Sequence, residues 1–201
     1  MAEREAPAVA TYLRGKRIGF RAPRLEDATS ANAWMIPSQN PWAMTFGFPM
    51  SKAAAEARLK EEETVPWGNN DTIRLVAVEL ATGAIVGGAL VSREHGRTGW
   101  IRSQVASWIG SDEAEALEAE MAGLLIEWTR QELDLMVIEY VVAGNRPELI
   151  ESITTRGFTE AARLREALQG ARGRIDLVWL ESVNDAWGSR IERSGVADDH
   201  A

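Results

Sequence analysis

The stretch that decides the fold runs from Trp108 to Trp128 and reads WIGSDEAEALEAEMAGLLIEW. It is typical of a strand end followed by a long helix, because apolar residues recur along it at intervals of three and four. We therefore expect an amphipathic helix that packs one apolar face against a sheet. That face carries Ala114, Leu117, Met121, Leu124, Leu125 and Trp128.

The turn before such a helix is where many α/β proteins hold a phosphate group, because free N–H groups and the positive end of the helix dipole meet there. A phosphate site favours glycines and basic or neutral side chains. Acids that lie in a first turn, however, stabilise the helix through its dipole by about 0.3–1 kcal/mol each, with no ligand involved. Acids are what this segment carries: Asp112, Glu113, Glu115, Glu118 and Glu120.

Length and composition bound the class of protein. The 201 residues predict one domain, which we place at residues 13–188 between flexible tails at 1–12 and 189–201. A net charge of -8 disfavours a nucleic-acid surface. The absence of cysteine and the distance between the two histidines disfavour a metal site. With no apolar run of about 20 residues and no signal peptide, we expect a soluble cytoplasmic protein.

The order of the predicted elements indicates an α+β fold. It predicts a mixed, mostly antiparallel sheet with helices on both faces. The antiparallel part is a meander whose turn is Ala81-Thr82-Gly83. We expect strands at 16–22, 72–80, 84–91, 100–109, 136–143 and 174–180, and helices at 25–36, 52–63, from 111 onward, and from Pro147 to about Gly157.

Five segments carry a resemblance to a known family: LRGKRIGFRAPRLEDA (13–28), FPMSKAAAEARL (48–59), VAVELATGAIVGGALV (76–91), AGNRPELIESITTRGFTEAARLREAL (143–168) and RIDLVWLESVNDAW (174–187). In this order and spacing they resemble the GCN5-related N-acetyltransferase (GNAT) superfamily, and most closely its ribosomal-protein alanine acetyltransferase branch. Segment 143–168 resembles an Asn-helix-Gly-Phe unit of that branch followed by a short strand. Segment 174–187 resembles its closing Asp-led strand and terminal helix.

The resemblance implies an acyl-CoA-dependent N-acyltransferase that acts on a small-molecule amine or a peptide N-terminus. In the family, the strands matching 100–109 and 136–143 are splayed, and acyl-CoA lies in the gap with its thioester near the splay. Backbone N–H groups of a glycine-rich loop hold the pyrophosphate. The amine attacks the thioester directly, helped by a residue or water that takes its proton. The implied cofactor-binding residues are Ser107, Trp108, Ile109, Gly110 and Ala114.

The chain departs from the family in that loop. In the family that loop begins with arginine or glutamine and contains glycines. The matching segment that follows Gly110, SDEAEALEAE, contains no glycine, arginine or glutamine. Clustered carboxylates near a phosphate at a partly desolvated site cost several kcal/mol, so this segment predicts weak or undetectable binding of acetyl-CoA. The alternative is a protein that keeps the fold without the cofactor. Such a protein uses the cleft for different chemistry, or as a non-catalytic binding or regulatory protein. The sequence leaves both functions open.

The resemblance also names catalytic candidates, Asn145 and Glu148. Glu148 stands where the family usually has a serine that reprotonates the leaving thiolate. A glutamate serves as that acid only if burial or a neighbour such as Glu151 raises its pKa. Each residue also has a purely structural interpretation, Asn145 as a helix cap and Glu148 as a helix-start carboxylate.

Substrate-binding candidates come from two places. Arg102 and Gln104 share one face of a predicted central strand, either toward a pocket or as sheet-surface residues. The loop 37–50 and the end of the helix before it carry Trp34, Trp42 and Phe46, which line a pocket or simply pack in the core. We expect a small-molecule or peptide partner, no nucleic acid and no membrane. Monomer and homodimer both stay open.

Overall fold

The computed structural model of the chain describes residues 11–27, 53, 54, 56, 57, 60, 72–94, 97–105, 111–170 and 173–184. Of the helix predicted at 25–36, it describes a single 3-10 turn, η1 (Leu25–Asp27). Residues 53, 54, 56, 57 and 60 are helical, as predicted for 52–63. The remaining parts of these two predicted helices lie outside the described residues.

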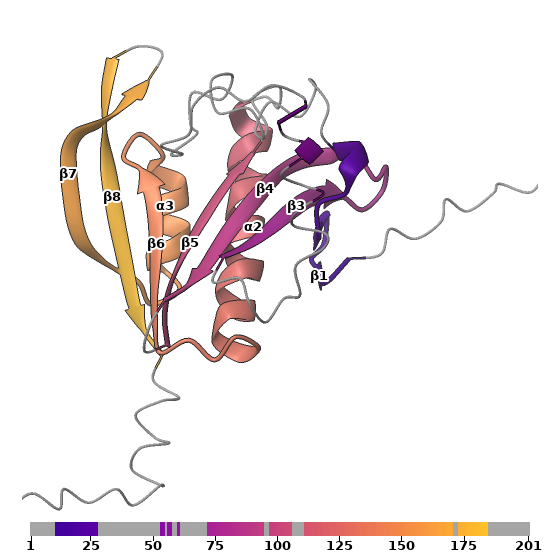
Figure 1. The fold of residues 1–201 in the computed structure, drawn as a ribbon. Helices are drawn as coiled ribbons and strands as arrows, with labels where there is room; N and C mark the ends of the chain where they lie inside the picture. Colours follow the sequence, from indigo (N-terminus) through magenta and orange to yellow (C-terminus); the bar gives the residue numbers. More distant parts are fainter. Residues whose placement is uncertain are drawn as a thin grey trace, which may run out of the picture.

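The described strands form one eight-stranded sheet in the order β1-β2-β3-β4-β5-β6-β8-β7 (Figure 1). All neighbouring strands are antiparallel except β5 and β6, which are parallel. The predicted α+β class with a mixed, mostly antiparallel sheet is therefore confirmed. The bounds are β1 Leu13–Arg14, β2 Ile18–Arg21, β3 Thr72–Glu79, β4 Ile85–Arg93, β5 Thr98–Val105, β6 Val137–Ala143, β7 Thr159–Gly170 and β8 Gly173–Val183.

Two helices, α2 (Ser111–Gln131) and α3 (Pro147–Thr154), lie side by side against one face of the sheet (Figure 1). A parallel strand pair needs a long crossover connection, and α2 supplies it between β5 and β6. Among the described helices, none has both the length and the apolar character of a membrane span.

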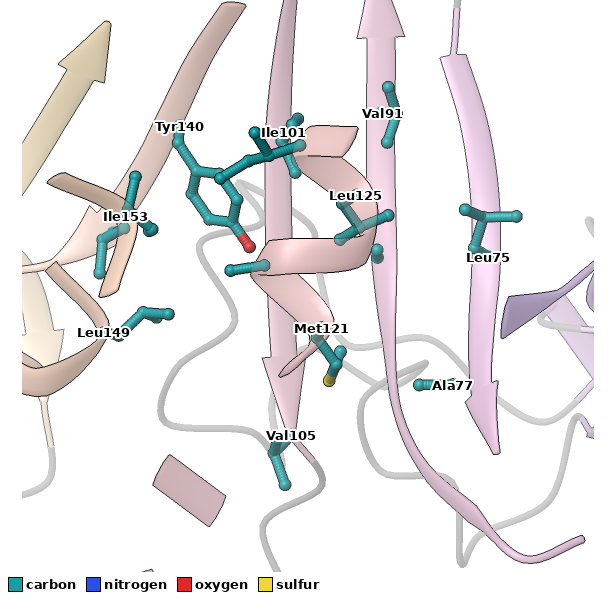
Figure 2. Packing of buried hydrophobic residues seen from close by; sticks show 14 of the residues in the cluster. Leu75, Ala77, Val91, Ile101, Val105, Met121, Leu125, Tyr140, Leu149 and Ile153 are labelled. Atoms are coloured by element: carbon teal, nitrogen blue, oxygen red, sulfur yellow. The ribbon is translucent and has the colours of Figure 1, made fainter. Parts of the chain in front are cut away.

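The apolar face of α2 is the one that the sequence predicts. Leu117, Met121 and Leu125 are almost completely buried, and Leu124 and Trp128 pack against the same core from partly buried positions. Burying a side chain of this size contributes about 1.5–3 kcal/mol. Figure 2 shows Met121 and Leu125 facing the strands that carry the core residues of the sheet, among them Leu75, Val91, Ile101 and Tyr140.

The meander from β3 to β4 turns where the sequence predicts, at residues 81–83. Gly83 adopts φ 74°, a left-handed conformation that glycine reaches without steric cost. Its N–H donates to the carbonyl of Glu79, and the N–H of Glu79 donates to the carbonyl of Ala84. The turn therefore closes the hairpin that leads into β5.

The C-terminal part follows the prediction through α3 and then departs from it. Gly157, at φ 85°, lies just beyond α3, as expected for a glycine that ends a helix. β7 then runs for 12 residues instead of forming a short strand, and it pairs with an 11-residue β8. The two strands form the edge of the sheet beside β6 (Figure 1).

One carboxylate fastens the N-terminal hairpin to α2. Glu120 accepts hydrogen bonds from the backbone N–H groups of Lys16, Arg17 and Ile18, at 2.7, 2.9 and 3.3 Å. Gly15 lies directly beside this carboxylate, and a Cβ at Gly15 would collide with it. The turn between β1 and β2 is thus built around the Glu120 side chain.

Replacing Glu120 with alanine leaves these three N–H groups without their acceptor, so we expect the free energy of unfolding to fall by about 1–3 kcal/mol. Urea denaturation measures the loss. The matched control is Glu127→Ala on the same helix, where an exposed carboxylate bonds the Gln131 side chain. That control should lose no more than about 0.5 kcal/mol. Equal losses in the two variants would contradict the role of Glu120.

Candidate functional site

The parallel strands β5 and β6 separate before either of them ends. Their pairing covers Thr98–Ile101 on β5 and Val137–Tyr140 on β6. β5 then continues to Val105, and β6 continues to Ala143 while paired with β8. The splayed strand pair that the resemblance implies is therefore present in the described part of these strands.

A half-open cavity lies at this separation. Its volume is about 30 Å³, and its walls come from the sheet and from both helices. β5 contributes a polar wall, β6 contributes an apolar wall, and α2 and the start of α3 each contribute one charged side chain. The lining residues are Ser103, Gln104, Glu118, Val141, Val142, Ala143, Arg146 and Leu149.

A hydrogen bond joins the separated strands on the side that faces α2. The Ser103 hydroxyl of β5 bonds to the Tyr140 hydroxyl of β6. Tyr140 is completely buried, and burial raises the pKa of its phenol above the usual value. Ser103 has the same strand parity as Ile101 and Val105, which belong to the core between the sheet and α2. Ser103 therefore connects the cavity to a buried tyrosine that stays protonated at neutral pH.

Glu118 and Arg146 form an ion pair at the cavity wall. The Arg146 guanidinium donates to the Glu118 carboxylate, and the Val105 backbone donates to the same group. Their side chains are only 7% and 16% exposed, for Glu118 and Arg146 respectively. Burial raises the pKa of Glu118 to about 7, even though both donors favour the charged carboxylate. This carboxyl group therefore changes charge close to neutral pH.

Two other acids of the α2 segment have partners of their own. Glu113 bonds the Arg17 guanidinium at 2.7 Å, and Glu120 holds the β1–β2 turn. Glu113, Glu118 and Glu120 thus each have a structural contact of their own.

The sequence-predicted site residues lie in different environments. Gln104 lines the cavity, and Ala114 is buried in the core under α2. Arg102, on the same face of β5 as Gln104, stacks its guanidinium 4.5 Å from the centre of the Trp100 ring. Asn145 and Glu148 are exposed at the start of α3, and the described cavity wall includes neither. The N-cap of α3 is Arg146, not Asn145.

Several predicted site residues lie outside the described part of the chain, so their placement stays a prediction. They are the cofactor-binding candidates Ser107, Trp108, Ile109 and Gly110 and the substrate-binding candidates Trp34, Trp42 and Phe46. Within the described residues, no cluster of His, Cys, Asp or Glu side chains is suited to hold a metal ion.

Sequence reasoning did not identify Ser103, Glu118 and Arg146 as site residues. Two of them carry a signal in the sequence. Glu118 follows Ala114 by four residues and precedes Met121 by three, so it lies on the apolar stripe of the helix, where an unpaired carboxylate is costly. Ser103 alternates with Ile101 and Val105 on the buried face of its strand. Arg146 has no such pattern, because its contact depends on how α3 sits against α2.

Comparison with known proteins shows which of them share this fold. No family model matches the sequence, and no curated protein matches it. Solved structures do match. A protein described as an acetyltransferase, from Sphaerobacter thermophilus DSM 20745, is 26% identical to this chain. Its TM-score is 0.64, over 87% of this chain and 98% of that one. The chain has the fold of the GNAT-family acetyltransferases.

Two further GNAT structures show the same arrangement at lower identity. The ribosomal-protein-S5-alanine acetyltransferase from Vibrio fischeri is 15% identical, with a TM-score of 0.65 over 87% of this chain and 97% of that one. Spermidine N-acetyltransferase from Vibrio cholerae, in complex with CoA and spermine, is 16% identical, with a TM-score of 0.63 over 84% and 96%. The superfamily resemblance seen in the sequence is confirmed, whereas these two identities establish the fold alone.

Glu118 makes the stability of this GNAT fold depend on pH. The pKa of its carboxyl group rises from a reference value of 4.5 to about 7 on folding, so the folded state binds more protons between these values. The stabilising contribution of the protonated carboxyl is complete below about pH 4.5 and is lost as the pH rises through about 7.

Replacing Glu118 with glutamine removes this titration. We expect the unfolding free energy of the parent minus that of Glu118→Gln to decrease by roughly 3 kcal/mol as the pH rises across this window. Urea denaturation of both proteins at several pH values measures the difference, and groups common to both cancel. A difference that does not change with pH would show that Glu118 titrates alike in the folded and unfolded chains.

Proposed function

We propose that the protein is an acyl-CoA-dependent N-acyltransferase that acts on a small-molecule amine or a peptide N-terminus. The observation that carries this proposal is the separation of β5 and β6 after Ile101 and Tyr140, with a cavity between the parted strands. In the GNAT superfamily, which the chain resembles in sequence and matches in fold, the acyl donor lies in this gap. The amine substrate of the Vibrio cholerae neighbour is consistent with the same class of acceptor.

The described residues fit the acyl end of such a donor. A volume of about 30 Å³ exceeds the roughly 10–15 Å³ that one water needs, so the cavity admits a small group such as an acetyl. Ser103 and Gln104 supply polar contacts on one side, and Val141–Ala143 supply an apolar wall on the other. Acyl-CoA would supply an acyl carbon activated as a thioester. The segment that would hold its phosphates, residues 106–110, lies outside the described residues.

The acids of α2 oppose a phosphate ligand less than their number in the sequence suggests. Glu113 is paired with Arg17, and Glu118 is paired with Arg146. Glu120 is engaged by three backbone N–H groups. A paired carboxylate presents a weaker field to a neighbouring anion than a free one, because its partner's opposite charge partly cancels it. These three carboxylates are therefore compatible with an acyl-CoA donor.

The second candidate is a protein with the GNAT fold that has lost acetyl-CoA binding and uses the cleft for other chemistry, or for binding or regulation. Two observations favour it. The segment from Ser111 to Glu120 contains no glycine that would let phosphate oxygens approach the backbone. The Glu118–Arg146 pair also brings two charged groups to the cavity wall, beside the place of the acyl group.

Calorimetry with acetyl-CoA separates the two functions. Acyl transfer requires saturable binding of acetyl-CoA. We also expect mass spectrometry to detect acetylated products when the protein is incubated with acetyl-CoA and a panel of polyamines, other primary amines and short peptides. Absence of binding at millimolar acetyl-CoA, together with absence of any acetylated product, would refute the acyltransferase and leave the cofactor-free function.

A side chain that fills the cavity tests the location of the site. Gln104→Trp places a large ring at the cavity wall, so we expect it to reduce acetyl-CoA binding and turnover at least tenfold, while the fold, monitored by circular dichroism, is kept. Thr98→Trp is the matched control, on the same face of β5 but where the strands are still paired. It should bind acetyl-CoA as the parent does. If the two variants behaved alike, the site would not lie at the separation of the strands.

A further inference from the structure

We propose that Glu118 is the proton acceptor of this site, and that Arg146 is the residue that positions its carboxylate. This inference rests on the proposed acyl transfer to an amine. In the step assigned to Glu118, one N–H bond of the substrate's ammonium group breaks and an O–H bond forms on the Glu118 carboxylate. The electron pair stays on the nitrogen, which becomes a nucleophile. The proton then leaves Glu118 for solvent through the half-open cavity.

The position of Glu118 supports this role. Among the described residues that line the cavity, Glu118 is the only carboxylate, and it shares with Ser103 and Gln104 the lining of a volume that admits a small group. A general base must be within hydrogen-bond reach of the proton it removes. The exposed Glu148 at the start of α3 does not line this cavity. Geometry therefore favours Glu118 over the acid that the sequence suggested.

The groups around Glu118 keep its carboxylate reactive. Arg146 from α3 and the Val105 backbone of β5 favour the charged form. Burial and the nearby Glu115 of α2 oppose it, and the buried Tyr140 of β6 interacts with it electrostatically. The balance puts the pKa of Glu118 at about 7, so near neutral pH the group is available both to accept a proton and to release it. A free surface glutamate would be a much weaker base.

Arg146 acts through Glu118, so the effect of removing Arg146 on the pKa of Glu118, and hence on the pH profile of activity, can be predicted. Without the guanidinium, the charged carboxylate loses a favourable partner and the pKa of Glu118 rises. A base works only when it is ionised, so the pH at which activity appears should move upward. Lysine at position 146 keeps the positive charge and should largely preserve the parent profile.

The first experiment measures steady-state kinetics with acetyl-CoA and the best amine acceptor from the panel. Glu118→Gln should lower kcat by about 100-fold or more, the range expected for loss of a general base, while the KM for acetyl-CoA stays within about threefold. The acidic limb of the parent's kcat/KM profile, expected near pH 7, should disappear in this variant. In Arg146→Gln the limb should move to higher pH, and in Arg146→Lys it should stay close to the parent's position.

The second experiment has a readout independent of turnover. Infrared spectroscopy follows the C=O stretch of protonated carboxyl groups in the free protein as the pH is raised. The parent should lose one such band near pH 7, Glu118→Gln should lack it, and Arg146→Gln should lose it at higher pH. Should Glu118→Gln fail to fold because Arg146 is left unpaired, the double variant Glu118→Gln/Arg146→Gln keeps a neutral hydrogen-bonded pair and replaces it in both experiments.

The results distinguish failure of this inference from failure of the proposed function. If the parent binds acetyl-CoA and acetylates amines but Glu118→Gln retains turnover within about threefold, the function stands and Glu118 is not the proton acceptor. A pH profile that is the same in parent and Arg146→Gln overturns the role of Arg146. If the parent neither binds acetyl-CoA nor forms product, the acyltransferase function fails, and this inference fails with it even if the infrared band is found.

Discussion

β5 and β6 are held together for four residues by backbone pairing and then by a side-chain bond. Tyr140, the last β6 residue that pairs with β5, bonds through its hydroxyl to Ser103, two residues beyond Ile101, the last β5 residue that pairs with β6. Its ring is completely buried in the core that α2 and α3 share with the sheet (Figure 2). The ring packs edge-on against Phe158. Because a close-packed ring cannot shift freely, the hydrogen bond between Tyr140 and Ser103 fixes how far the strands separate. The cavity beyond it thereby has a defined size.

The helix that covers this separation carries acids with distinct partners, and position along α2 decides each one. Glu113, near the helix start, meets Arg17 at the surface, where an ion pair contributes at most about 1 kcal/mol. Glu120, about two turns further along, reaches the β1–β2 turn, while Glu118 faces the interior. A run of acids that looks uniform in the sequence therefore anchors the N-terminal hairpin and polarises the cavity at the same time.

Periodicity was sufficient for most of the fold and for one wall of the site. The α2 stripe, the β3–β4 hairpin and the apolar β6 follow from side-chain spacing, and strand parity brought Gln104 to the cavity. β7 was underestimated, because its Ala, Glu, Arg and Leu residues are helix formers that pairing with β8 overrides. A bulge at Glu166, with φ 52°, further interrupts its pattern. The Glu118–Arg146 contact could not be derived, since it joins residues 28 apart through the packing of two helices.

Stability alone gives no reason for a charged pair in this position. Removing two ions from water costs several kcal/mol each, and apolar residues of similar volume often hold a core as well or better than a buried ion pair. Leu117 and Met121, the immediate neighbours of Glu118 on the apolar stripe, provide that kind of packing along the same helix. Breaking the pair by removing one partner, in contrast, leaves an uncompensated charge and costs about 3–5 kcal/mol. The fold thus retains an ion pair that its packing does not require, and this pair lies at the wall of the cavity between the separated strands β5 and β6. Acid–base chemistry in that cavity gives the pair a purpose that packing does not.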